Sequence, residues 1–194
     1  MTSRKNPARR VRVLVGGAAL ALVGAGVVGT VAANAADSTG SAPAAAPVAA
    51  RSGNLTQSTH LTLDAATKAA QAAVDAAEKD GRQVSVAVVD RDGNALVTLR
   101  GDGAGPQSYE SAERKAFTAV SWNAPTSELA KRLEQAPTLK DIPGTLFLAG
   151  GAPVTAQGAP VAGIGVAGAP SGDLDERYAQ AGAAALGHVS GRDQ

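Results

Sequence analysis

Alanine and glycine dominate this sequence and limit the kind of core that it can build. The chain has 194 residues, of which 44 are alanine and 23 are glycine, whereas only five are Phe, Tyr or Trp. Small side chains let helices and strands pack closely, but each buries little apolar surface, and such burial is the main driving force for folding. The sequence therefore predicts a thin core within one domain of ordinary size, with helices lying close against a sheet.

The sequence also excludes several kinds of metal site. It contains no cysteine, so disulfides and zinc or iron–sulfur sites built on thiolates cannot form. Its two histidines, His60 and His188, are too few for a three-histidine zinc site within one chain. Both stand at the ends of the predicted domain, where an ordinary surface role is the alternative to a ligand role.

Charge divides the chain into two unlike parts. Residues 1–36 contain five basic residues and no acidic one, whereas residues 37–194 contain 13 basic and 17 acidic residues, a net charge of −4. The basic start precedes an apolar run at 13–33 and the small-x-small sequence Ala-Asn-Ala-Ala at 33–36, a pattern typical of a secretory signal and its cleavage site. The pair Arg9-Arg10 favours export by the twin-arginine pathway, and export by the general secretory pathway is the alternative. An uncleaved membrane anchor is the alternative, because the run is about long enough to span a bilayer.

We therefore expect a secreted protein with four parts. Residues 1–36 are the signal peptide, and residues 37–53 are a flexible linker of Ser, Ala, Pro and Gly that cannot bury enough surface to fold. Residues 54–188 are the folded domain, and residues 189–194 are a polar tail. The acidic balance after the signal argues against a nucleic-acid partner, which would require a basic face.

Hydrophobic periodicity predicts the element order αββααββα. Hairpins joined by helices indicate an α+β layered domain, an antiparallel sheet with flanking helices, rather than a Rossmann unit. The Gly-x-Gly-x-x-Gly at 163–168 is late in the chain and is not followed by a βαβ unit, so its glycines are better explained by close approach of a strand to a helix or a flat ligand. The predicted helices are 61–80, 108–119, 126–135 (capped by Thr126) and 174–186, and the predicted strands are 83–90, 95–100, 145–149 and 161–166.

One pair of acidic residues points to metal chemistry. Glu110 and Glu113 lie three residues apart on one face of the second predicted helix, beside Arg114 and Lys115. Carboxylates so placed repel each other unless a cation lies between them, so they are candidate oxygen ligands for a metal ion. A solvated helix face is the alternative. No Gly-x-Ser-x-Gly, cysteine or triad histidine suggests a nucleophilic enzyme.

Six segments together resemble the GlcG/HbpS family, in its order and spacing, across residues 61–186. The resemblance implies a profilin-like α+β fold, an octamer, and haem binding with slow haem degradation. It also implies iron-dependent signalling to a SenS-like membrane sensor histidine kinase under oxidative stress. The segments are VSVAVVDRDG at 84–93, SAERKAFTA at 111–119, PT at 125–126, IPG at 142–144, GGAPV at 150–154, and VAGIGVAG at 161–168 followed by DERYAQAG at 175–182.

The resemblance also implies particular site residues. His60, Glu110 and Glu113 match the family's iron site, and a mixed nitrogen and oxygen set suits iron better than calcium. Thr145, after Pro-Gly, matches the haem contact, with the start of a strand as the alternative. Lys115 and its neighbour Arg114 are candidates to pair with haem propionates, with a salt-bridged surface as the alternative.

These observations favour a haem-binding and iron-binding sensor protein. The first alternative is a GlcG-type enzyme or a haem-degrading protein without a signalling role, and the second is a purely structural secreted oligomer. Because the sequence offers no general base or nucleophile, any turnover would be chemistry of the cofactor with dioxygen or peroxide.

Overall fold

The computed structural model describes residues 47–187. The expected signal peptide, most of the linker, His188 and the polar tail lie outside these residues. The chain divides into two units between residues 49 and 50, and the second unit is the one described below. Among the residues described, none of the helices is both long and apolar enough to cross a membrane.

The domain is built on a four-stranded sheet whose strand order is β2-β1-β4-β3, with every neighbouring pair antiparallel. Four helices accompany it, and short 3₁₀ turns follow α3. The predicted α+β class, its antiparallel sheet and the order αββααββα are therefore confirmed. The elements are α1 (Leu63–Lys79), β1 (Ser85–Asp90), β2 (Ala95–Arg100), α2 (Pro106–Trp122), α3 (Thr126–Lys131), β3 (Gly151–Ala156), β4 (Ala159–Ala167) and α4 (Gly172–Ala184).

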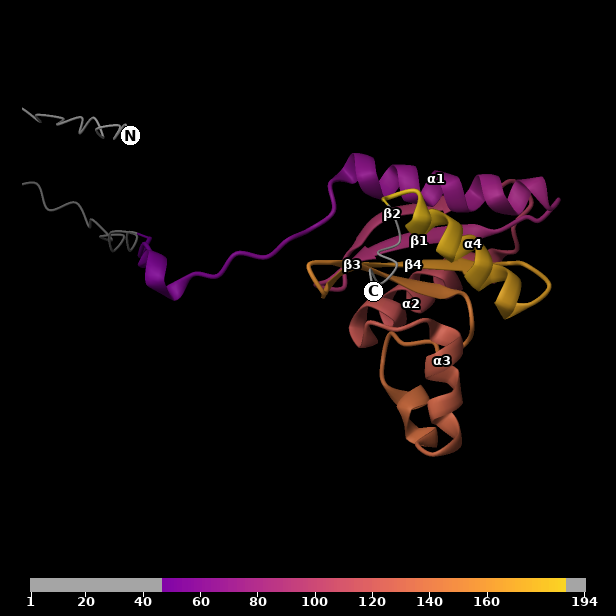
Figure 1. The fold of residues 1–194 in the computed structure, drawn as a ribbon. Helices are drawn as coiled ribbons and strands as arrows, with labels where there is room; N and C mark the ends of the chain where they lie inside the picture. The colour runs from indigo at the N-terminus through magenta and orange to yellow at the C-terminus, as the bar shows by residue number, and fades with distance from the viewer. Residues whose placement is uncertain (1–46, 188–194) are drawn as a thin grey trace, which may run out of the picture. The chain divides into compact units, whose positions relative to one another are not determined.

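The helices cover both faces of the sheet (Figure 1). Helices α1 and α4 lie together on one face, and α2 lies on the other with α3 beyond it. Alternation along β1 serves both layers, since Val86 and Val88 pack with α1 while Ala87 and Val89 pack with α2. The core is thus two thin layers, one on each side of the sheet.

Close packing of α2 on β4 depends on glycine. A Cβ atom on Gly165 would lie 1.9 Å from the carbonyl oxygen of Ala112, and one on Gly163 would lie 2.1 Å from that of Ala116. Neither distance is possible for real atoms, so the strand requires glycine for the helix to approach this closely. The predicted role of these glycines beside a helix is confirmed.

The third strand lies later than predicted. No strand forms at residues 145–149; Phe147 is instead buried beside Leu129 and meets the Trp122 ring edge-on, with ring centroids 5.2 Å apart. The third strand is instead formed by residues 151–156, which follow the predicted one. Pro153 has no N–H to donate to the sheet, but β3 is an edge strand, where proline is tolerated.

The expected cap of the third helix is also wrong. Pro125 occupies the N-cap position, and the helix begins at Thr126, whose hydroxyl oxygen accepts the Gly151 N–H at 2.7 Å. Beside it, the buried carboxylate of Glu176 accepts hydrogen bonds from the Ser127 hydroxyl at 2.5 Å, the Ser127 N–H at 2.9 Å and the Gly150 N–H at 3.3 Å. This contact joins α3, α4 and the start of β3.

Candidate functional site

The paired carboxylates of α2 border one surface hollow of about 350 Å³. Glu110 is exposed and lies 2.5 Å from the guanidinium of Arg114, one helical turn further on. Two carboxylates at the same opening provide oxygen ligands suited to a hard or borderline metal ion. The hollow is lined by Val89, Gly93, Glu110, Glu113, Arg114, Phe117 and Gly144.

The apolar part of this hollow is the buried side chain of Val89 and the half-buried ring of Phe117. The ring lies between two turns, because a Cβ on Gly93 would be 2.9 Å from one ring edge and a Cβ on Gly144 would be 3.6 Å from the other. The β1–β2 turn and the turn before Thr145 are thus both held against α2. The hollow combines an apolar ring, two carboxylates and one guanidinium.

Thr145 lies next to the hollow, directly after Gly144. It belongs to no strand, so the strand-start alternative is wrong. Its side chain is buried, and its hydroxyl donates to the Ile142 carbonyl at 2.7 Å. The hydroxyl oxygen keeps acceptor capacity while its proton is engaged.

Lys115 has a different place from the one we expected. Its side chain is only 6% exposed, and its ammonium lies 2.8 Å from the Asp175 carboxylate and donates to the Val166 carbonyl at 3.0 Å. The ammonium is therefore directed into the domain and is not available to a ligand at the surface. Arg114, whose side chain is 49% exposed, is the cation that lines the hollow.

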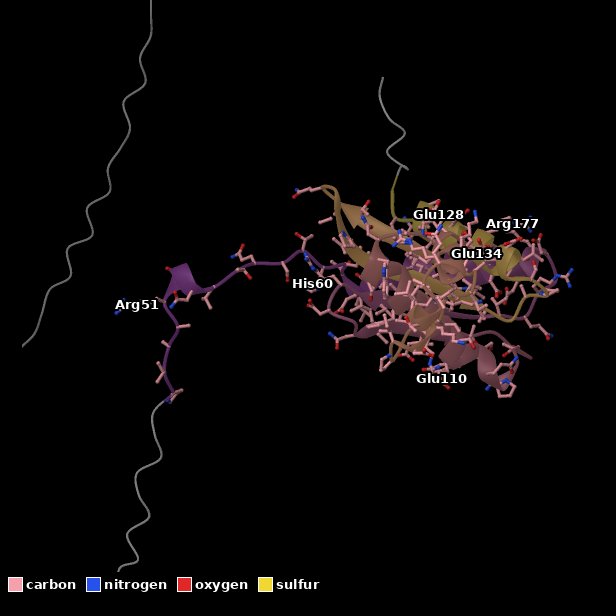
Figure 2. The ribbon with its side chains drawn as sticks, turned by 90° about the horizontal axis from the view of Figure 1, so that it is seen from below. Arg51, His60, Glu110, Glu128, Glu134 and Arg177 are labelled. Atoms are coloured by element: carbon pink, nitrogen blue, oxygen red, sulfur yellow. The ribbon has the colours of Figure 1, made fainter. Side chains whose placement is uncertain are left out.

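His60 lies apart from the carboxylate pair of α2, as Figure 2 shows for His60 and Glu110. It lies instead at the β1–β2 turn, where its Nε2 is 3.5 Å from the Asp92 carboxylate and 2.6 Å from the Ser58 hydroxyl. Within residues 47–187, the one group of three metal-ligating side chains is His60, Asp90 and Asp92, with ligand atoms within 4.8 Å of one another. The structure therefore does not bring the three expected iron ligands together within one chain.

Sequence reasoning missed Asp90 and Asp92 as companions of His60. The predicted strands 83–90 and 95–100 are confirmed as a hairpin, β1 and β2, and the aspartates lie at the end of β1 and in the turn that joins the two strands. The signal that could have identified the aspartates is Asp-x-Asp-Gly directly after a buried strand, because such a turn places two carboxylates at one edge of the sheet.

A larger hollow of about 610 Å³ lies between the edge strand β3 and α4. None of its lining side chains carries a charge. The lining residues are Pro125, Ala152, Pro153, Val154, Thr155, Gln180, Ala183, Ala184, Leu186 and Gly187.

Fold and site together define a class. An antiparallel sheet layered between helices carries an acidic hollow on α2, and nothing lining that hollow is a serine, cysteine or histidine nucleophile or base. The class is an α+β layered domain with an acidic surface hollow. The sequence profile of a family described as "Haem degrading protein HbpS-like" matches residues 61–184, and the chain belongs to this family.

Solved structures of related proteins agree with this assignment. A crystal structure of a Streptomyces reticuli HbpS double mutant, with aspartate replacing glutamate at two positions three residues apart, is 89% identical, with a TM-score of 0.74, covering 75% of this chain and all of that one. A crystal structure of HbpS is 90% identical, with a TM-score of 0.72, covering 73% of this chain and all of that one. A haem complex of PduOC is 28% identical, with a TM-score of 0.60 and coverage of 66% and 95%. No curated protein matched the chain.

Proposed function

We propose that this chain is a secreted haem-binding and iron-binding protein that degrades haem or releases its iron, and that acts as the accessory sensor of a membrane histidine kinase under haem or oxidative stress. The observation that carries the proposal is the hollow on α2, which brings Glu110, Glu113 and Arg114 to one opening beside Thr145. Membership of the HbpS-like family and the haem complex of the relative PduOC support it.

The lining residues fit a haem placed against the surface. Phe117 provides an apolar contact for a macrocycle, and the Arg114 guanidinium can pair with a propionate, a match that guanidinium makes with two parallel hydrogen bonds. Thr145, whose buried hydroxyl donates to the Ile142 carbonyl and whose neighbour Gly144 lines the hollow, is the candidate contact to the haem iron on the family resemblance. When bound, haem supplies the redox chemistry with dioxygen or peroxide, which no side chain of the hollow can supply.

Arg114 couples the two kinds of ligand in this proposal. Without ligand it pairs with Glu110, and because both side chains are largely exposed, such a pair contributes at most about 1 kcal/mol. A haem propionate can therefore replace Glu110 as the partner of Arg114 with only a small loss of free energy. The Glu110 carboxylate is then free. Haem binding and exposure of an iron-binding carboxylate then occur at the same place.

The spacing of the carboxylates supports iron capture at this pair. Glu110 and Glu113 are the one pair of glutamates three residues apart in the sequence, and the HbpS double mutant changes two glutamates with that spacing. Two carboxylates leave other coordination positions for water or peroxide. We propose that iron freed from haem binds here.

Export, assembly and signalling complete the proposal. The N-terminal signal pattern supports secretion, and the family resemblance supports an octamer and a membrane sensor histidine kinase as partner. The uncharged hollow at the open edge strand β3 is a surface that a second copy can cover, which suits a domain with so thin a core.

Titration of the purified protein with hemin, followed by the Soret band, tests haem binding. We expect saturable binding that Thr145→Ala and Arg114→Gln weaken, while Arg132→Gln on the exposed turn after α3 leaves it unchanged. A wild-type protein without a saturable Soret change would refute haem binding.

Ferrous iron titration of Glu110→Gln/Glu113→Gln tests iron capture separately. If this double variant takes up as much iron as wild type does, Glu110 and Glu113 are not the iron ligands. Light scattering tests the octamer.

A further inference from the structure

The buried hydroxyl of Thr118 joins α2 to the turn that contains Thr145. Its Oγ1 donates to the Arg114 carbonyl, one helical turn earlier, and accepts the Leu146 N–H, with both distances 2.8 Å. Leu146 directly follows Thr145, and Arg114 lines the hollow. We propose that Thr118 is a positioning residue, which holds the Thr145 turn against α2 and so sets the place of Thr145 relative to Arg114. This role rests on the proposed function, in which both residues contact haem.

The turn that contains Thr145 is closed on itself by local hydrogen bonds. The N–H and the hydroxyl of Thr145 both donate to the Ile142 carbonyl, at 3.3 Å and 2.7 Å. These bonds fix the shape of the turn but not its place on α2. The ring of Phe117 also packs on the turn, but an apolar contact is non-directional. The bond from Leu146 to Thr118 is directional, so it fixes where the turn lies along the helix.

Thr118 lies too deep to be a haem ligand itself. It is fully buried and is not among the residues that line the hollow. Its hydroxyl uses its one proton on the Arg114 carbonyl, so its oxygen is available to accept the Leu146 N–H. A valine at this position has a similar shape but leaves the Leu146 N–H without that partner, which is unfavourable in the interior. Thr118 therefore acts on haem only through the groups that it holds in place.

A second buried threonine makes a similar contact away from the hollow. Thr126 is also fully buried, and its hydroxyl oxygen accepts the Gly151 N–H at 2.7 Å. This bond joins the start of α3 to the start of β3, and neither residue lines the hollow on α2. Thr126→Val therefore removes a comparable buried hydrogen bond without changing the haem site. It is the matched control for Thr118→Val.

Hemin titration of the purified full chain, followed by the Soret band, tests the role of Thr118. We expect Thr118→Val to raise the apparent dissociation constant for hemin by about tenfold, the scale of one buried donor left without a partner. The Soret maximum should also shift, because Thr145 no longer keeps its place at the iron. Thr118→Ser retains the hydroxyl and should restore the wild-type affinity and Soret maximum. Thr126→Val should lower the urea midpoint about as much as Thr118→Val does, but bind hemin as wild type does.

The outcomes separate this role from the proposed function. If wild type binds hemin and Thr118→Val binds it with the same affinity and Soret maximum, the positioning role is overturned and the proposed function stands. The role is also overturned if Thr126→Val weakens hemin binding as much as Thr118→Val does, because the effect then follows stability alone. A wild-type chain without saturable hemin binding would refute the proposed function, and the positioning role with it.

Amide hydrogen exchange of the wild-type chain tests the contact itself and does not depend on whether any variant folds. The Leu146 N–H should exchange much more slowly than the N–H of Leu148, whose side chain is exposed, because exchange requires the bond to Thr118 to open. Slow exchange at Leu146 would support the contact. Equally fast exchange at both positions would overturn the proposal, whatever the hemin titration shows.

Discussion

The Lys115 ammonium and the Asp175 carboxylate form an ion pair inside the domain, with Nζ and Oδ2 2.8 Å apart and each side chain at most 6% exposed. The pair joins α2 to the first turn of α4 at the end of β4, where Lys115 also donates to the Val166 carbonyl. Two charges so removed from water are stable only together.

Lys115→Met should therefore destabilise the protein by about 3–5 kcal/mol, because it leaves the Asp175 carboxylate buried without its cation. Urea denaturation measures this change in the free energy of unfolding. Adding Asp175→Asn to the same chain should recover much of the loss, since the second charge is then removed as well. Equal losses in the single and double variants would contradict a coupled pair.

Glu176→Gln should destabilise the protein by about 1.5–3 kcal/mol, the usual contribution of hydrogen bonds to a charged group. One oxygen of Glu176 accepts from both the Ser127 and Gly150 N–H groups, and the other accepts from the Ser127 hydroxyl. An amide has only one oxygen to offer these donors. The matched control is Glu134→Gln on the exposed turn after α3. If urea denaturation shows a comparable loss of stability in this control, Glu176 does not stabilise the protein through its contacts with α3 and the start of β3.

Much of the fold could be predicted because patterns among neighbouring residues determine its helices and strands. Helical spacing of alanines and alternation of valines gave the element order, and the small residues predicted the close approach that Gly163 and Gly165 make to α2. The third strand could not be predicted in the same way. The apolar residues at 145–149 resemble a strand in sequence. In the structure Phe147 instead packs in the cluster with Leu129, a tertiary contact that the local sequence does not reveal.

Gly165→Ala should destabilise the protein by about 1–3 kcal/mol or more, because the added methyl group would overlap the Ala112 carbonyl and force α2 away from β4. Thermal unfolding followed by circular dichroism measures the change. Gly53→Ala is the control, since nothing lies within 4 Å of the corresponding Cβ position. A Gly165→Ala protein as stable as wild type would mean that the helix and strand do not approach as closely as described.

The sequence could predict only that part of the candidate site whose residues lie on a single helix. Glu110 and Glu113 are three residues apart, so helical geometry alone puts them at one opening. Lys115 shares their helix, but Ala112, Lys115 and Ala119 follow the spacing of the buried face, which turns its charge inward. His60 and its aspartates meet across 30 residues of chain, and no local pattern states such a contact.

The pH dependence of stability should include a contribution from Asp80, where α1 ends against α4. Its carboxylate accepts the Tyr178 hydroxyl at 2.8 Å and pairs with Arg177. The hydrogen bond from Tyr178 lowers the pKa of Asp80 against the opposing effect of desolvation, and Arg177 and Arg82 lower it further. The folded protein therefore takes up this proton less readily than the unfolded chain does.

The stabilisation from Asp80 is therefore fully present above the ordinary aspartate pKa and is lost as the pH falls through the lower pKa of the folded state. In Asp80→Asn this loss has already occurred, so its urea midpoint should fall less between pH 5 and pH 3, about the range in which such carboxylates titrate, than the wild-type midpoint does. Asp141→Asn, an exposed aspartate at the end of the 3₁₀ turn at 137–141, should retain the wild-type slope. If Asp80→Asn and wild type lose stability in parallel over this range, the contact between α1 and α4 does not depend on the charge of Asp80.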